Sequence, residues 1–300
     1  MRRGKSSWLI FLSVSASCLL ATPVLASPLN IGTISTEPAS EIKKFHPFTT
    51  YLAKQLRGEG ISEGRVIVGK NISEIAALLK QGKVDLYIDS AFPTIAVSRL
   101  SGSKLMLRRW KKELAEYHSV IFAKNGGGVK ELGDLKGKMI SFEEPFSSSG
   151  YLLPKLVMAQ NGLKLGQKNN SADPVRSEEV GYVFARDDEN TMVWVLRGMV
   201  AAGATDNQSF VKEARGNLAS LSIVHKTFSI PRQLVSYRAD LTLGLVNRIK
   251  EILIQLHQVD DGKKILLGFE RTTKFDEIPE QSMEPLFKAG KFIDAEIKAQ

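Results

Sequence analysis

The sequence is nearly free of cysteine. Its only cysteine in 300 residues is Cys18, which lies in an apolar N-terminal stretch. Once that stretch is removed no thiol remains, so disulfides, thiolate metal sites and cysteine nucleophiles are excluded. The histidines are also few and lack the spacing of metal ligands, and we therefore expect no metal site. They are His46, His118, His225 and His257.

Long apolar runs are also scarce. The stretch Trp8–Leu20 is diluted by serines and is shorter than the ~20 residues of a membrane-spanning helix. Positive charge at residues 2–5 precedes it and the small residues of Val24–Ala26 follow it, which is the pattern of a secretory signal peptide. The alternative is lipoprotein processing at Cys18, but the usual leucine is missing before it. We expect residues 1–26 to be removed after Ala26 and the protein to be secreted.

Motifs for a cofactor or a nucleic acid are lacking. The turn Gly126–Gly128 is not followed by the Lys-Ser/Thr pair of a phosphate loop. The formal net charge of +9 at pH 7 falls to +6 once Arg2, Arg3 and Lys5 are removed, and this moderate basicity suits an anionic ligand or a cell-envelope surface. However, Arg108–Lys112 is a single short basic cluster, more typical of a solvated strand end than of a nucleic-acid interface. We expect no cofactor and no nucleic-acid partner.

Strands and helices alternate in the first part of the chain. Residues 29–32, 65–68 and 84–88 have the apolar character of buried strands, and helical spacing marks two helices between them. This β-α-β-α-β order predicts a mainly parallel, doubly wound sheet. Because such sheets bind ligands beyond the carboxyl ends of their strands, we expect the site near Thr33–Thr36 and Asp89–Thr94.

A second α/β unit follows, and the chain then returns to the first. We predict two doubly wound α/β lobes joined by a two-strand hinge, with crossings near residues 115–125 and 222–232. Lobe 1 is expected to comprise residues 27–120 and 229–300, and lobe 2 residues 121–228. A cleft between the lobes that closes around a ligand is the expected consequence.

Three hydroxyls and a glycine, Ser147–Gly150, stand between a predicted strand at 138–142 and a helix beginning near Leu152. The unpaired N–H groups and positive dipole end of a helix start favour an anion there. One serine would suffice as a simple N-cap, which is the alternative. Three consecutive hydroxyls favour a ligand site.

The chain resembles a known family at this motif. The region 135–154, with its Ser147–Pro154 block, is similar to the signature of the phosphate, phosphite and phosphonate substrate-binding proteins of ABC transporters. Weaker similarity covers Gln81–Asp85, Arg197–Ala204 and Ile230-Pro231. The resemblance implies a type II periplasmic-binding-protein fold, a periplasmic location and a small anionic or zwitterionic ligand. It also implies a membrane ABC permease as partner. A sensor role with a membrane kinase is the alternative, and we expect a monomer.

The resemblance also implies ligand-binding residues. Hydroxyls and amides of the serine block would hold phosphoryl oxygens, and Asp206 lies where the family can place an acid that binds a ligand amine. An aromatic hydroxyl and a histidine typical of the family are missing, since 90–94 and 186–189 stand there. Acids near the site favour a zwitterion, with Asp188 and Asp206 ahead of Glu143, Glu144 and Asp187. The predicted ligand-binding residues are Ser147, Ser148, Ser149, Gly150, Tyr151, Ser90, Phe92, Thr94, Asp188 and Asp206. Tyr151 could equally be a core residue of its helix.

An enzyme is the alternative from another class. Ser149, His225 and Asp206 supply the residue types of a serine-hydrolase triad. However, the residues before Ser149 are serines rather than the Gly-x of a nucleophile elbow. We therefore expect a binding protein without catalytic residues.

Overall fold

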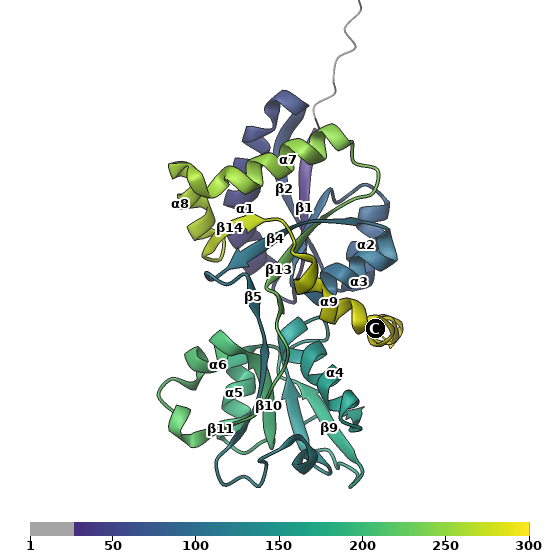
Figure 1. Cartoon of the computed structure of the whole chain (residues 1–300), viewed down its shortest axis with the longest axis vertical. Helices are drawn as coiled ribbons and strands as arrows, with labels where there is room; N and C mark the ends of the chain where they lie inside the picture. Colours follow the sequence, from purple (N-terminus) through teal and green to yellow (C-terminus); the bar gives the residue numbers. More distant parts are fainter. Residues whose placement is uncertain (1–26, 300) are drawn as a thin grey trace, which may run out of the picture.

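The structure is a computed structural model and describes residues 27–299. The predicted signal peptide and its cleavage after Ala26 lie outside the described residues. Within 27–299, none of the helices combines the length and the apolar character that crossing a bilayer requires. Figure 1 shows an elongated molecule with two lobes stacked along its long axis.

Lobe 1 is built on a six-stranded sheet. In spatial order its strands are β14 (Thr272–Asp276), β4 (Lys104–Lys111), β13 (Gln233–Tyr237), β3 (Leu86–Asp89), β1 (Ser27–Ile34) and β2 (Ile61–Gly69). β1 pairs in parallel with β2 and β3, as the alternating pattern predicts. In the other half of the sheet, β13 is antiparallel to both β3 and β4, and β14 is antiparallel to β4. The carboxyl ends of β1, β2 and β3 therefore share one edge of the sheet.

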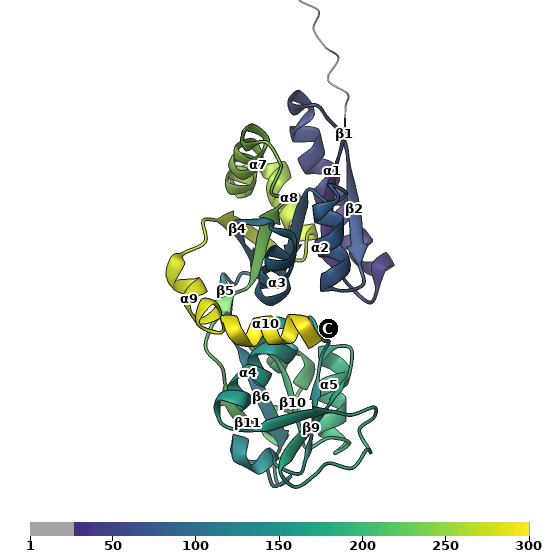
Figure 2. The same ribbon diagram turned by 90° about the vertical axis from the view of Figure 1, so that its right-hand side faces the viewer.

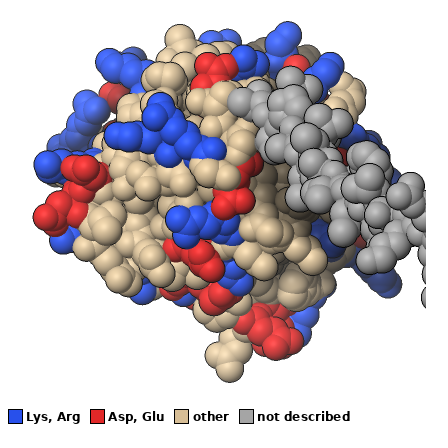
Figure 3. Space-filling view, turned by 90° about the horizontal axis from the view of Figure 1, so that it is seen from above, with Lys and Arg blue, Asp and Glu red and all other residues tan. Residues whose placement is uncertain are grey.

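Helices cover both faces of this sheet, because each helix presents an apolar stripe. One face carries α1 (Pro38–Gln55), α7 (Leu243–Gln255) and α8 (Asp260–Gly268), which pack around Phe48 and Phe269. The other face carries α2 (Ile72–Lys80), α3 (Ala91–Ser101) and α9 (Glu280–Lys288). Figure 3 views the molecule from the lobe-1 end and shows basic and acidic side chains interspersed on that face.

Lobe 2 repeats this architecture. Its strands are, in spatial order, β11 (Leu221–Lys226), β6 (Ser119–Lys124), β10 (Ala202–Asp206), β7 (Met139–Phe142), β9 (Glu179–Phe184) and β8 (Lys164–Gln167). β7 pairs in parallel with β10 and β9, and β6 is antiparallel to β10 and β11. The helix α4 (Leu153–Gln160) covers one face, and α5 (Asp188–Leu196) and α6 (Asn207–Ala214) cover the other. The predicted pair of α/β lobes is confirmed.

Two short strands connect the lobes. β5 (Glu116–Tyr117) pairs antiparallel with β12 (Ile230–Pro231), and both lie within the segments predicted to cross. One further helix, α10 (Gly290–Ala299), lies between the lobes (Figure 2). The sequence pattern predicts that residues 229–300 belong to lobe 1, whereas α10 contacts helices of both lobes. The exact division of the chain stays a prediction.

Candidate functional site

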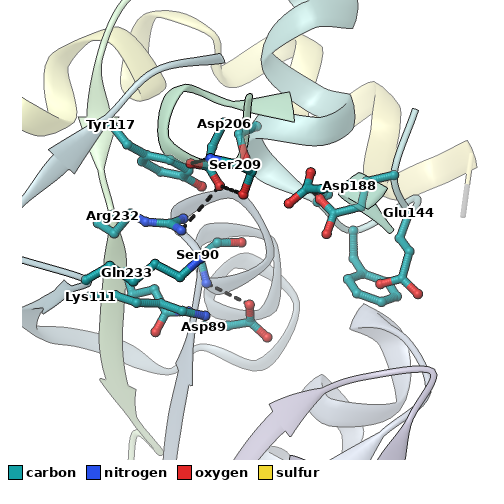
Figure 4. Close-up of a pocket in the computed structure, with 15 residues that line it drawn as sticks. Asp89, Ser90, Lys111, Tyr117, Glu144, Asp188, Asp206, Ser209, Arg232 and Gln233 are labelled. Carbon is teal, nitrogen blue, oxygen red and sulfur yellow. Dashed lines mark hydrogen bonds and ion pairs between the residues drawn. The ribbon is translucent and has the colours of Figure 1, made fainter. Parts of the chain in front are cut away.

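A cavity of about 190 Å³ lies beside the hinge, where the two lobes face each other. The carboxyl ends of β3 and β4, the loop after β7, the starts of α5 and α6 and the hinge strands all contribute to it (Figure 4). This is the position that parallel α/β sheets favour for ligands. The lining residues are Asp89, Ser90, Lys111, Lys112, Tyr117, Glu143, Glu144, Phe146, Ser147, Ser149, Asp188, Asp206, Ser209, Arg232 and Gln233.

Arg232 is the main cation of the hinge side. Its side chain is buried, its guanidinium carbon lies 4.2 Å from the ring centroid of Tyr117, and Nη2 lies 3.4 Å from Asp206 Oδ2. Its Nε is buried and has no hydrogen-bond partner within residues 27–299. Because burying a charged donor without a partner is costly, this unmatched N–H points to an acceptor that enters the cavity.

Lys111 lies on the same side of the cavity, at the end of β4. Its amine pairs with Glu270 at 2.7 Å, and Glu270 also accepts from the fully buried Arg109. Burial lowers the pKa of Lys111, while Glu270 opposes that shift. Although burial disfavours the Glu270 carboxylate, Lys111 and Arg109 hold its pKa well below the usual range. The pair therefore fixes Lys111 at the edge of the cavity.

Carboxylates line the opposite side. Figure 4 shows Asp188 and Glu144 across the cavity from Arg232 and Lys111. Glu143 accepts a hydrogen bond from the Ser147 hydroxyl at 2.5 Å, and Asp188 accepts one from the Thr205 hydroxyl.

Burial raises the pKa of Glu143 well above its usual value, and Asp188 raises it further. Burial and then Asp206 raise the pKa of Asp188. This side of the cavity therefore favours bound protons or a cationic group.

Replacement of Glu143 by glutamine is expected to stabilise the ligand-free protein at pH 8 by ~1–2 kcal/mol, because it removes a partly buried charge that the neighbouring Asp188 disfavours. A raised carboxyl pKa means that the folded wild type binds a proton more readily than the unfolded chain. Wild-type stability from this group is therefore lost as the pH rises through the folded pKa. The advantage of Glu143→Gln should shrink as the pH falls. Urea unfolding between pH 5 and pH 8 measures the difference in stability between the variant and the wild type. Glu178→Gln is the control, because Glu178 is exposed. A destabilised variant at pH 8 would show that the ionised Glu143–Ser147 pair outweighs burial.

Asp89 is a partly buried acid at the floor of the cavity, at the end of β3. It accepts hydrogen bonds from the Ser90 and Ile34 amides and from the hydroxyls of Tyr87 and Thr33. Burial raises its pKa to about 6, and the two amides partly offset that shift. Asp89 thereby joins the ends of β1 and β3 beneath the cavity.

The three hydroxyls of the serine motif have different partners. The Ser147 hydroxyl accepts from the Gly150 amide at 2.9 Å and donates to Glu143, so its one proton is already used. The Ser148 hydroxyl accepts from the Phe92 amide at 2.9 Å and donates to the Ser90 hydroxyl. It thus caps α3 of the opposite lobe. Ser149 lines the cavity beside the phenol of Tyr117. Burial raises the pKa of Tyr117, and the hydrogen bond with Ser149 lowers it in part.

Half of the predicted binding residues line the cavity. Ser90, Ser147, Ser149, Asp188 and Asp206 lie there, and Ser148, Gly150, Tyr151, Phe92 and Thr94 do not. Whether any of the last five contacts a ligand stays a prediction.

The structure explains the positions of three of these five. Tyr151 is buried in the lobe-2 core against Phe142, and Thr94 donates to the Ser90 carbonyl at 2.9 Å. Gly150 is required because a Cβ there would lie 2.5 Å from the Cβ of Glu143. A side chain at position 150 would therefore collide with Glu143, which lines the cavity.

Sequence reasoning did not select Arg232, Lys111 or Tyr117. Arg232 could have been selected from the sequence, because it lies in a predicted crossing between the lobes, directly after Ile230-Pro231. Residues at such a crossing lie at the base of the predicted cleft. The hydrolase residues are not assembled: Ser149 and Asp206 line the cavity, whereas His225 lines a separate hollow with Glu131 and Asn161. Within the described part of the chain, no three His, Cys, Asp or Glu side chains could hold a metal ion.

Comparisons with known proteins identify the family and the fold. Residues 31–282 match the family described as the periplasmic substrate-binding protein of phosphonate ABC transporters. Among solved structures, XAC2383 from Xanthomonas citri bound to ATP is 22% identical with a TM-score of 0.82, over 91% of this chain and 98% of that chain. PhnD1 from Prochlorococcus marinus in complex with methylphosphonate is 18% identical with a TM-score of 0.68, over 90% of this chain and 99% of that chain. At these identities the structural likeness concerns the fold.

Proposed function

Because this chain belongs to the periplasmic substrate-binding proteins of phosphonate ABC transporters, we propose that it captures a small oxyanion, best a zwitterionic one, between its two lobes. Proteins of this family deliver a ligand to a membrane importer and are not enzymes. The phosphonate-, phosphite- or phosphate-like head group would lie on the hinge side of the cavity. Cleavage after Ala26, a monomeric state and an ABC permease as partner belong to the same proposal.

The observation that carries the proposal is the unmatched Nε of the buried Arg232. An arginine presents its donors in a fixed fork that suits a tetrahedral oxyanion. The Ser149 and Tyr117 hydroxyls beside it add neutral donors from two parts of the chain. Together they form a cationic end for the ligand's anionic group.

The acids of the opposite side support the zwitterionic part of the proposal. The lining holds more carboxylates than cations, so a bare polyanion would meet repulsion there. Both oxygens of Asp206 are already engaged, by the amides of Gln208 and Ser209, the Ser209 hydroxyl and Arg232. Asp188 and Glu143 have fewer donors and are better placed to bind a ligand amine.

The volume of the cavity limits the size of the ligand. At about 190 Å³ it admits a head group with a short chain rather than a nucleotide. A thermal-shift screen tests the proposal, since a ligand that binds only the folded protein raises the melting temperature. We expect shifts with methylphosphonate and larger ones with aminomethylphosphonate. A protein that responds to none of phosphate, phosphite, phosphonates, sulfonates and aminophosphonates would contradict it.

A further inference from the structure

The helix α10 contacts both lobes at once (Figure 2). On the lobe-1 side, Arg99 of α3 donates to the Gly290 carbonyl at 2.8 Å and pairs with Asp294. These contacts attach the start of α10 to the helix that begins at the cavity floor. They are partly exposed, so their own contribution to stability is small.

On the lobe-2 side the contact is buried. Glu296 accepts hydrogen bonds from the Tyr151 hydroxyl and the Lys155 amine, both at 2.8 Å. Its side chain is 9% exposed, and that of Lys155 is 15% exposed. Burial, and then Glu296, raise the pKa of Tyr151, so its phenol stays protonated and able to donate. Tyr151 directly follows the serine motif.

An apolar core joins the same three parts of the chain. Leu152, Leu153 and Leu156 of lobe 2 belong to one buried cluster with residues of α3 and of α9–α10. The contributing residues of those helices include Ile95, Ala96, Met283, Leu286 and Ile293. Removing apolar side chains from water stabilises the arrangement in which they pack together. Moving the lobes apart at this point would expose part of this apolar cluster to water.

We propose that Glu296 is a positioning residue: through Tyr151 and Lys155 it fastens α10 to lobe 2, and the α9–α10 arm thereby biases the two lobes toward the closed arrangement before any ligand binds. The arm is a third connection between the lobes, beside β5 and β12. It acts at the helix that carries the serine motif, so it also sets how Ser148 reaches Ser90 and the Phe92 amide across the cleft.

The proposal concerns the ligand-free protein and is independent of the identity of the ligand. A binding protein exists as a mixture of open and closed forms, and each contact made only in the closed form shifts that mixture. Loss of the Glu296 contacts leaves the Lys155 amine without its counter-charge in a half-buried site. The closed form should therefore lose population relative to the open form.

The test is a distance distribution between the lobes by double electron–electron resonance. Protein beginning at Ser27 lacks cysteine, so spin labels attach only at two introduced positions, Lys70→Cys and Glu189→Cys, which are exposed on opposite lobes. Without ligand, the short-distance population is expected to dominate in otherwise wild-type protein. In Glu296→Ala the long-distance population should grow severalfold. Tyr151→Phe, which removes only the hydroxyl, should shift it in the same direction by less.

Glu284→Ala is the matched control, because Glu284 forms an exposed ion pair with Lys288 on α9 and contacts no lobe-2 residue through it. It should leave the distances unchanged. Glu296→Gln retains an acceptor for Tyr151 and should restore part of the closed population. Folding is checked by circular dichroism, and Tyr151→Phe serves if Glu296→Ala does not fold. Unchanged distances in folded Glu296→Ala, or equal shifts in Glu284→Ala, would overturn the proposal.

Discussion

Replacement of Arg232 by methionine is expected to remove nearly all affinity for methylphosphonate. The cavity would keep its volume and the packing on Tyr117, but the anionic head group would be buried without its principal counter-charge. Removing one partner of a buried charge pair costs ~2–5 kcal/mol. That corresponds to a loss of about thirty- to several thousandfold in the binding constant. Isothermal titration calorimetry measures it directly.

The matched control for this experiment is Arg238→Met. Arg238 is also a lobe-1 arginine in ion pairs, with Asp85 and Asp240, but it does not line the cavity. The Arg238→Met protein should bind methylphosphonate with the affinity of the wild type. The Arg232→Met protein should remain folded, because Asp206 keeps its hydrogen bonds to the start of α6. Equal affinities of Arg232→Met and wild type would place the anion elsewhere.

The second large effect is expected for Asp188→Asn, and it should depend on the ligand. Aminomethylphosphonate carries an amine that the partly buried Asp188 is placed to pair with, whereas methylphosphonate carries none. Loss of the carboxylate should weaken the first ligand by about a hundredfold. Methylphosphonate should bind with nearly unchanged or higher affinity, because a like charge has been removed from the cavity.

Calorimetric titration of both ligands into both proteins gives the comparison. Glu189→Gln is the control, since Glu189 is the next acid of α5 but is exposed and pairs with the exposed Arg215. It should affect neither ligand. Equal losses for the two ligands in Asp188→Asn would show that Asp188 supports the site without binding an amine.

The sequence allowed the two lobes to be predicted because local patterns determine them. Apolar strands alternating with amphipathic helices lead to a parallel β1–β2–β3 arrangement, and the structure confirms it. The start of a helix at the serine motif could be predicted for the same reason. In contrast, β8 lies at a sheet edge, and its half-exposed residues lack a clear strand pattern.

The partners of the site residues could not be predicted from local pattern. Ser148 binds Ser90 and the Phe92 amide, which lie more than fifty residues earlier in the chain. Arg232 stacks on Tyr117 only because β5 and β12 pair at the hinge. Such contacts depend on how the two lobes come together.

A crystal structure of the protein with aminomethylphosphonate would show where the phosphorus atom lies. We expect a phosphonate group between the lobes, with an oxygen in hydrogen-bond distance of Arg232 Nε and the amine facing Asp188 and Glu143. A phosphonate bound outside this cavity, or one reversed so that the amine faces Arg232, would contradict it.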